Sequence, residues 1–115
     1  MQKHVLFVLK PGFHDEKDGP FFCPGCATVE GFLKYAPQVE GRLEVRRIEF
    51  PRPRREIVEL IGAVNQGCPV LVLAGDSDLP GEAKKSEETG NAYISGAIPI
   101  CEYLGRTFGA VRPHP

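Results

Sequence analysis

The sequence predicts an α/β fold in which a mixed four-stranded sheet carries helices on both faces. Three observations support this prediction. Residues 5–9 and 70–74 are short, continuous apolar runs, as in strands that are buried on both faces of a sheet. Three other segments repeat apolar residues at helical spacing. The length of 115 residues suits a single domain, residues 1–115, with a core at about 4–109.

The elements are expected in the order β-α-β-α-β-β-α. After the first strand, residues 11–22 are mostly polar and form a long loop. A helix begins at Cys23, with Pro24 at its first position, and ends before Pro37. The next strand covers about 43–50, and its alternation changes phase at Arg46 and Arg47, which indicates a bulge. Because a helix joins the first two strands, they should be parallel, with a right-handed crossover.

The second half of the chain adds a helix at about 53–64 and the strand at 70–74. A polar segment, residues 75–91, is expected to be a long, mobile loop. Residues 92–94 form a short edge strand that pairs with 70–74 as a hairpin. Ser95 then caps the last helix, which ends at Gly109.

Composition excludes several classes of function. The net charge is −1 and no basic run alternates with aromatic residues, so nucleic-acid binding is not expected. No apolar run approaches the roughly 18 residues of a membrane span. The N-terminus lacks the apolar stretch of a signal peptide, so we expect a cytoplasmic protein without a membrane partner.

Four cysteines, Cys23, Cys26, Cys68 and Cys101, carry the chemistry of the sequence. Structural disulfides are rare in the cytoplasm, so the Cys-x-x-Cys pair at 23–26 indicates redox or metal chemistry. Backbone N–H groups and the helix dipole at a helix N-terminus favour a thiolate, which makes Cys23 the candidate nucleophile. Cys26, one turn deeper, is the candidate resolving thiol; the alternative is an inert structural pair. Cys101 is expected to be a small buried apolar residue.

The element order, the Cys-Pro-Gly-Cys sequence at 23–26 and Pro69 directly before the third strand resemble the thioredoxin superfamily. The chain is more narrowly similar to glutaredoxins and to the N-terminal domain of glutathione S-transferases. The combination of Lys-Pro-Gly-Phe at 10–13, Phe-Pro-Arg-Pro-Arg at 50–54 and Asn-Gln-Gly-Cys-Pro at 65–69 resembles a small bacterial thioredoxin-like family of unknown function. The resemblance covers about residues 4–109.

The resemblance implies that the Cys68–Pro69 bond is cis and that Cys68 faces the Cys-x-x-Cys pair. Three thiols would then converge. They could serve a thiol–disulfide oxidoreductase whose partners are protein or small-molecule thiols and disulfides. A second hypothesis is a non-catalytic binding module in which Cys23, Cys26 and Cys68, with His14 as a fourth ligand, hold zinc, Cu(I) or an iron–sulfur cluster. A third is that Cys68 is a small buried residue.

Glutathione binding in similar proteins uses a basic residue after the first strand, the backbone beside the cis-proline and polar groups that open the last helix. Lys10, Cys68, Pro69 and Ser95 are the corresponding candidates. However, residues 96–99 supply no carboxylate for the γ-glutamyl end, so we expect weak or no glutathione binding and no required cofactor.

Arginines gather between positions 46 and 55. They form either a solvated face or a docking surface for an acidic partner protein. The five are Arg46, Arg47, Arg52, Arg54 and Arg55.

Overall fold

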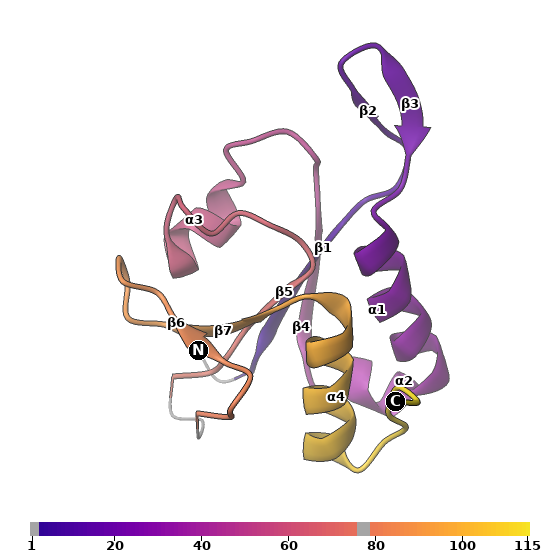
Figure 1. Cartoon of the computed structure of the whole chain (residues 1–115), viewed down its shortest axis with the longest axis vertical. Helices are drawn as coiled ribbons and strands as arrows, with labels where there is room; N and C mark the ends of the chain where they lie inside the picture. The colour runs from indigo at the N-terminus through magenta and orange to yellow at the C-terminus, as the bar shows by residue number, and fades with distance from the viewer. Residues whose placement is uncertain (1–2, 76–78) are drawn as a thin grey trace.

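The chain forms an α/β fold around one mixed five-stranded sheet, from which a two-stranded hairpin projects (Figure 1). The computed structural model describes residues 3–75 and 79–115. The other residues, 1–2 and 76–78, fall at the start of the predicted domain and inside the predicted 75–91 loop, and lie outside the described residues. The elements are β1 (Val5–Leu9), β2 (Phe13–Asp15), β3 (Asp18–Phe21), α1 (Pro24–Tyr35), α2 (Pro37–Glu40), β4 (Glu44–Ile48), α3 (Arg55–Ile61), β5 (Val70–Val72), β6 (Lys84–Lys85), β7 (Ala92–Ser95) and α4 (Ala97–Phe108).

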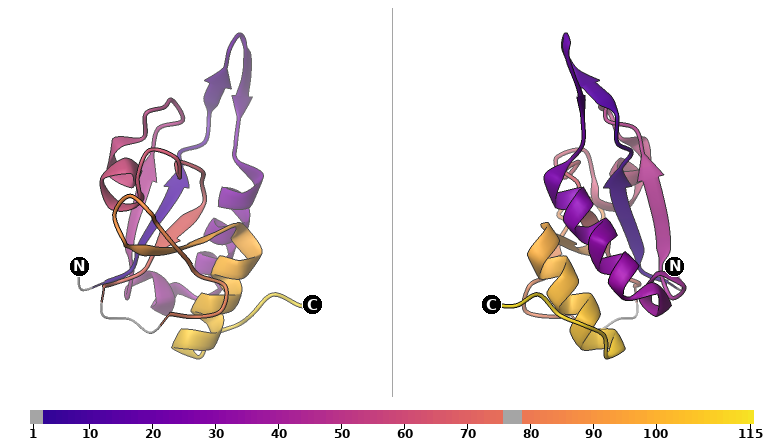
Figure 2. Two further views of the ribbon diagram at one scale, coloured as in Figure 1. Left: turned by 60° about the vertical axis from the view of Figure 1, so that its left-hand side comes forward. Right: turned by 90° about the vertical axis from the view of Figure 1, so that its right-hand side faces the viewer.

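The sheet has the strand order β4-β1-β5-β7-β6. β1 and β4 are parallel, as predicted for strands that a helix joins, and the other pairs are antiparallel. β1 is central and fully apolar because both of its faces are covered. Leu6 and Val8 face a cluster that α1 and α4 complete, whereas Val5 and Phe7 face a smaller cluster with α3 (Figure 2). Helices therefore cover both faces, as predicted.

The main sheet has five strands, one more than the four predicted. Residues 92–94 were expected at the edge, but β7 lies inside the sheet, with β6 on its outer side. The two lysines of β6 gave no apolar pattern, so only their pairing with β7 identifies them as a strand. The described 79–91 segment is also anchored to α3 by side-chain hydrogen bonds. Ser86 is buried and donates a hydrogen bond to the Ile61 carbonyl (2.8 Å) at the end of α3.

The predicted 11–22 loop contains the β2–β3 hairpin. A two-stranded hairpin is only marginally stable alone in water, so it needs outside support. Phe13 supplies this support, because its ring stacks on that of Phe50 with 4.3 Å between centroids. The hairpin rises above the start of α1 and away from the sheet (Figure 1).

The bulge predicted at Arg46 and Arg47 is absent, since the β1–β4 register is continuous from Val5↔Glu44 to Leu9↔Ile48. The phase change has another cause. β4 is an edge strand, and its two arginines cover opposite faces with their long side chains. Arg47 pairs with Glu30 of α1, whereas the Arg46 guanidinium lies 5.5 Å from the Phe7 ring on the α3 side.

The two later helices differ from prediction at their ends. α3 stops at Ile61 instead of near 64, because Gly62 adopts a positive φ of 90°, which breaks the helix. Ser95 does not cap α4: it is the last residue of β7, and Gly96 is the N-cap, with no side-chain cap hydrogen bond. At the other end of α4, Gly109 is left-handed, as predicted for a C-terminal stop.

Candidate functional site

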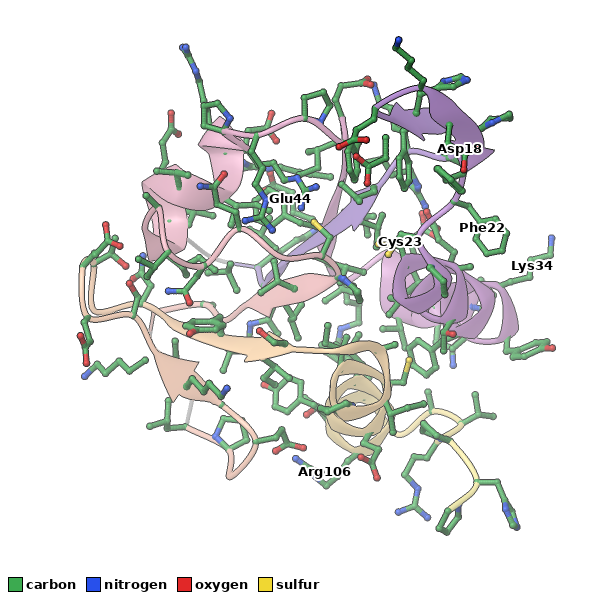
Figure 3. All side chains as sticks on the ribbon, turned by 45° about the horizontal axis from the view of Figure 1, so that its top comes forward. Asp18, Phe22, Cys23, Lys34, Glu44 and Arg106 are labelled. Carbon is green, nitrogen blue, oxygen red and sulfur yellow. The ribbon has the colours of Figure 1, made fainter. Side chains whose placement is uncertain are left out.

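The site begins at Cys23, the N-cap of α1. Its sulfur accepts a hydrogen bond from the Cys26 backbone N–H at 3.1 Å, so it occupies the position that a Ser or Asp oxygen takes in other helices. A thiolate here is stabilised by that N–H and by the positive end of the helix dipole. Cys23 is partly exposed, and Figure 3 shows it over the start of α1 beside the outward-pointing Phe22.

Cys26 lies one turn deeper and is 3% exposed. Burial is the largest cause that raises the pKa of Cys26, to about 12, and a side-chain hydrogen bond to Cys23 also raises it. The Leu9 backbone N–H donates to the Cys26 sulfur at 3.3 Å. The pair thus has a partly exposed sulfur at the start of the helix and a buried sulfur one turn deeper.

The loop before β5 brings a third cysteine to the pair. The Cys68–Pro69 bond is cis, as the resemblance implied, and so are the Gly19–Pro20 and Arg52–Pro53 bonds. The Cys23 thiol donates to the Cys68 carbonyl oxygen at 3.8 Å. Close approach of α1 to this loop depends on Gly25, where an added Cβ would lie only 3.0 Å from Pro69 Cδ. Gly25 therefore has a packing role that the Cys-x-x-Cys pattern alone did not indicate.

The surroundings of Cys68 shift the pKa of its thiol in opposite directions. Burial raises the pKa of Cys68 to about 11, while the charges of Arg54 and Arg52 and a side-chain hydrogen bond from Arg54 lower it. The charge of Cys23 raises it again, as expected when two thiols are close. The charges of both the candidate nucleophile and a guanidinium group therefore act on the third thiol.

Arg54 was expected on a solvated or partner-binding surface, but it belongs to the surroundings of Cys68. It is only 8% exposed and bridges two loops. Its Nε and Nη2 donate to the Phe50 carbonyl at 2.9 and 2.7 Å, and its Nη1 donates to the Gln66 carbonyl at 2.7 Å. The guanidinium carbon also lies 5.4 Å from the centre of the Phe50 ring. Arg54 thus fixes the loop that leads to Cys68, and only its position between two prolines and a helix distinguished it in the sequence.

A shallow pocket of about 380 Å³ opens beside the pair. Leu9, Pro11 and Phe22 give it an apolar wall, and Phe22 is 62% exposed. Cys23 and Cys26 also line it, so an apolar group bound there would lie next to the thiols. The sequence contained these residues but gave no sign that they meet.

The other predicted site residues are arranged as follows. Lys10 follows β1 and forms an exposed ion pair with Glu49 at 2.9 Å. Ser95 is opposite Val70 in the β5–β7 register, next to the Cys68–Pro69 loop. His14 is exposed on the hairpin. Among residues 3–75 and 79–115, no group of three or more His, Cys, Asp or Glu side chains has an arrangement that could hold a metal ion.

The five arginines do not form one surface. Arg54 is buried, so it cannot contact a partner. Arg46 pairs with Glu44 and Glu56, and Arg47 pairs with Glu30 and Glu40, so internal carboxylates offset their charge. Arg52 and Arg55 remain exposed on the β4–α3 segment.

Comparison with known proteins gives a family without an assigned activity. Residues 3–112 match the family described as "Protein of unknown function (DUF3088)". No curated protein and no solved structure matches the chain. No helix within the described part of the chain is long and apolar enough to cross a membrane.

Proposed function

We propose that the chain, which belongs to the DUF3088 family of proteins of unknown function, is a thiol–disulfide oxidoreductase with a thioredoxin-like fold. One observation carries the proposal: the asymmetry of the Cys-x-x-Cys pair. Cys23 is partly exposed and accepts the Cys26 backbone N–H at 3.1 Å, whereas Cys26 is 3% exposed. An inert structural pair would need neither an exposed member nor a helix N-terminus that stabilises its thiolate.

The reaction follows from this asymmetry. The Cys23 thiolate attacks one sulfur of a substrate disulfide, and the other sulfur leaves as a thiolate and takes a proton. Cys26, one helical turn away, then attacks Cys23 Sγ in the mixed disulfide. Its proton goes to the second substrate thiolate as that group leaves. The substrate disulfide is reduced by two electrons, the two cysteines are oxidised to a disulfide, and a dithiol reductant reverses both steps.

The surroundings of the pair favour an apolar substrate over glutathione. The wall formed by Leu9, Pro11 and Phe22 suits an apolar side chain next to a cysteine of a protein substrate. Lys10 is occupied by Glu49, and α4 begins without a carboxylate for the γ-glutamyl amine. Reduced glutathione should therefore bind the Cys23→Ser protein more weakly than roughly 1 mM, or about −4 kcal/mol, in titration calorimetry.

The test compares the four thiols of the reduced protein by timed alkylation with iodoacetamide at pH 8, followed by peptide mass spectrometry. With pKa values of about 12 for Cys26 and 11 for Cys101, fewer than roughly 1 in 1,000 of these thiols ionise at pH 8. A freely exposed thiol is about a quarter ionised at that pH. Cys23 should react at least 100-fold faster than Cys101; equal rates would remove the case for an activated nucleophile.

A second measurement tests the redox cycle itself. Native mass spectrometry with and without dithiothreitol should show the loss of two hydrogens on oxidation, mapped to Cys23 and Cys26. In a separate assay, the protein should catalyse the reduction of insulin with dithiothreitol as the reductant. The Cys23→Ser protein should fail in both assays. The Cys101→Ala protein is its matched control, since it also lacks one thiol but keeps the Cys23–Cys26 pair. If the protein instead retains a stoichiometric metal and forms no disulfide, the metal-binding module described from the sequence replaces this proposal.

A further inference from the structure

We propose that Cys68 is a second resolving thiol for Cys23, and that Arg54 is the residue that positions it. The inference rests on the proposed function and adds a second way to complete its reaction. Two resolving thiols would flank one nucleophile: Cys26 from inside α1, and Cys68 from the loop before β5.

The geometry places the Cys68 loop against the nucleophile. The Cys23 sulfur is 3.8 Å from the Cys68 carbonyl oxygen. Both side chains are partly exposed, so neither is sealed off by the core. Gly25 leaves the space that lets Pro69 and the start of α1 approach so closely. A mixed disulfide on Cys23 would therefore form next to the main chain of Cys68 as well as beside Cys26.

Arg54 holds this loop in place through the hydrogen bonds to the Phe50 and Gln66 carbonyls. Gln66 is two residues before Cys68, so these hydrogen bonds restrain the segment of chain that leads to the cysteine. The Arg54 backbone N–H adds a bond to Gln66 Oε1 at 2.7 Å. The Cys68 loop is thus tied from both the side chain and the backbone of one residue.

Charge separates the two resolving candidates. The charged and titratable groups that face Cys68 are the guanidinium groups of Arg54 and Arg52 and the thiols of Cys23 and Cys26. Two cations thus favour the Cys68 thiolate, while burial and the other thiols oppose it. Cys26 is 3% exposed, whereas Cys68 is partly exposed, and no cation is among the groups that shift the pKa of Cys26. The attacking form should therefore be more accessible for Cys68 than for Cys26.

The step balances without a further oxidant. After the substrate disulfide has formed a mixed disulfide with Cys23, the Cys68 thiolate attacks Cys23 Sγ. The Cys23–Cys68 bond forms, the bond from Cys23 to the substrate breaks, and the substrate thiolate leaves with the proton given up by Cys68. The substrate gains the two electrons that the two cysteines lose.

The experiment removes Cys26 and asks whether Cys68 takes its place. A Cys26→Ser, Cys101→Ala protein is treated with oxidised glutathione at pH 7.5 and examined by intact-mass and peptide mass spectrometry. The expected product is a Cys23–Cys68 disulfide without bound glutathione. A matched Cys26→Ser, Cys68→Ser, Cys101→Ala protein should keep the glutathione adduct on Cys23. If the first protein also keeps its adduct, Cys68 is not a resolving thiol.

The role of Arg54 is tested in the same background. In the Arg54→Gln variant, loss of the nearby charge should slow release of glutathione about tenfold at pH 7.5 and move the rate–pH profile to higher pH by about one unit. Arg54→Lys should restore most of the profile. A slower rate with an unmoved profile, in a variant whose circular dichroism matches the parent, would contradict the charge role.

Failure of this inference is distinguishable from failure of the proposed function. The Cys68→Ser protein keeps the Cys23–Cys26 pair and should still reduce insulin. If it does so while the Cys26→Ser protein retains its adduct, only the second resolving thiol is refuted. If neither protein forms an internal disulfide, the oxidoreductase proposal itself fails.

Discussion

Replacing Arg54 by methionine should destabilise the fold substantially, although arginine is usually a surface residue. The side chain is 8% exposed and donates to two main-chain carbonyls, those of Phe50 and Gln66. Methionine keeps an unbranched apolar side chain of similar reach, but it cannot donate a hydrogen bond. The change therefore isolates the hydrogen bonds from the packing.

The magnitude follows from the two carbonyls. A buried acceptor that loses its partner costs about 1–3 kcal/mol, and bonds from charged donors lie toward the upper end. Both carbonyls are partly buried, so water can replace some of the lost donors, and we expect about 1–1.5 kcal/mol for each. The free energy of unfolding should fall by about 2–3 kcal/mol, or roughly 10 °C in the melting temperature of a domain of this size.

Urea denaturation of the reduced protein, followed by circular dichroism at pH 7, gives the measurement. Arg55→Met is the matched control, because Arg55 is the next residue and its side chain is exposed. It should change the free energy of unfolding by less than about 0.5 kcal/mol. Arg54→Lys should fall between the two, since a single ammonium group cannot reach both carbonyls with the same fork. If Arg54→Met unfolds at the same urea concentration as Arg55→Met, the proposed tether of the Cys68 loop is wrong.

Three further predictions concern other parts of the molecule. Burial raises the pKa of Cys101 to about 11, against about 8.5 in an unfolded chain, so this thiol stabilises the fold fully below pH 8.5 and progressively less as pH rises to 11. Between pH 9 and 10.5, Cys101→Ala should make the fall of unfolding free energy shallower by about 1.1 kcal/mol per pH unit, and equal slopes in urea titrations would contradict this. His4→Phe should lower the free energy of unfolding by about 1–3 kcal/mol in urea denaturation, because His4 Nδ1 accepts a hydrogen bond from the buried Ala74 N–H at 2.8 Å. Unchanged hydrogen exchange at the Ala74 amide would contradict this prediction. Phe13→Ala should speed hydrogen exchange within the β2–β3 hairpin while exchange in β1 stays as slow as before, since the hairpin lies outside the sheet; equal protection in both proteins would show that Phe13 stacking does not hold it.

The central strands could be predicted from the sequence because their continuous apolar runs indicate burial on both faces. Residues 5–9 are apolar at every position, and the structure buries every one of them between two helical layers. The 11–22 segment was different, because its hairpin depends on the contact of Phe13 with Phe50, far along the chain. β6 could not be predicted either, since two lysines become a strand only by pairing with β7. Local pattern fails where a distant partner supplies the stability.

In the candidate site, too, some residues could be predicted from the sequence and others could not. Cys23, Cys26 and Cys68 are visible as residue types, and the helix start explains why Cys23 is the exposed member. Arg54 is not visible, because its neighbours in the arginine run have the same chemistry and different surroundings. Only the two carbonyls that it contacts distinguish it from the solvated Arg55.

The packing of Cys68 bears on how well its loop is held next to the Cys-x-x-Cys pair. Cys68 packs against both hydrophobic clusters, the one with α1 and α4 and the smaller one with α3. The loop that carries it is therefore held by both layers of the fold as well as by Arg54. A thiol on a free loop would have to search for Cys23 and pay the entropy of ordering for each encounter. The Cys68 main chain is already held beside Cys23, so a Cys68 resolving step, as proposed above, would need movement of the side chains only.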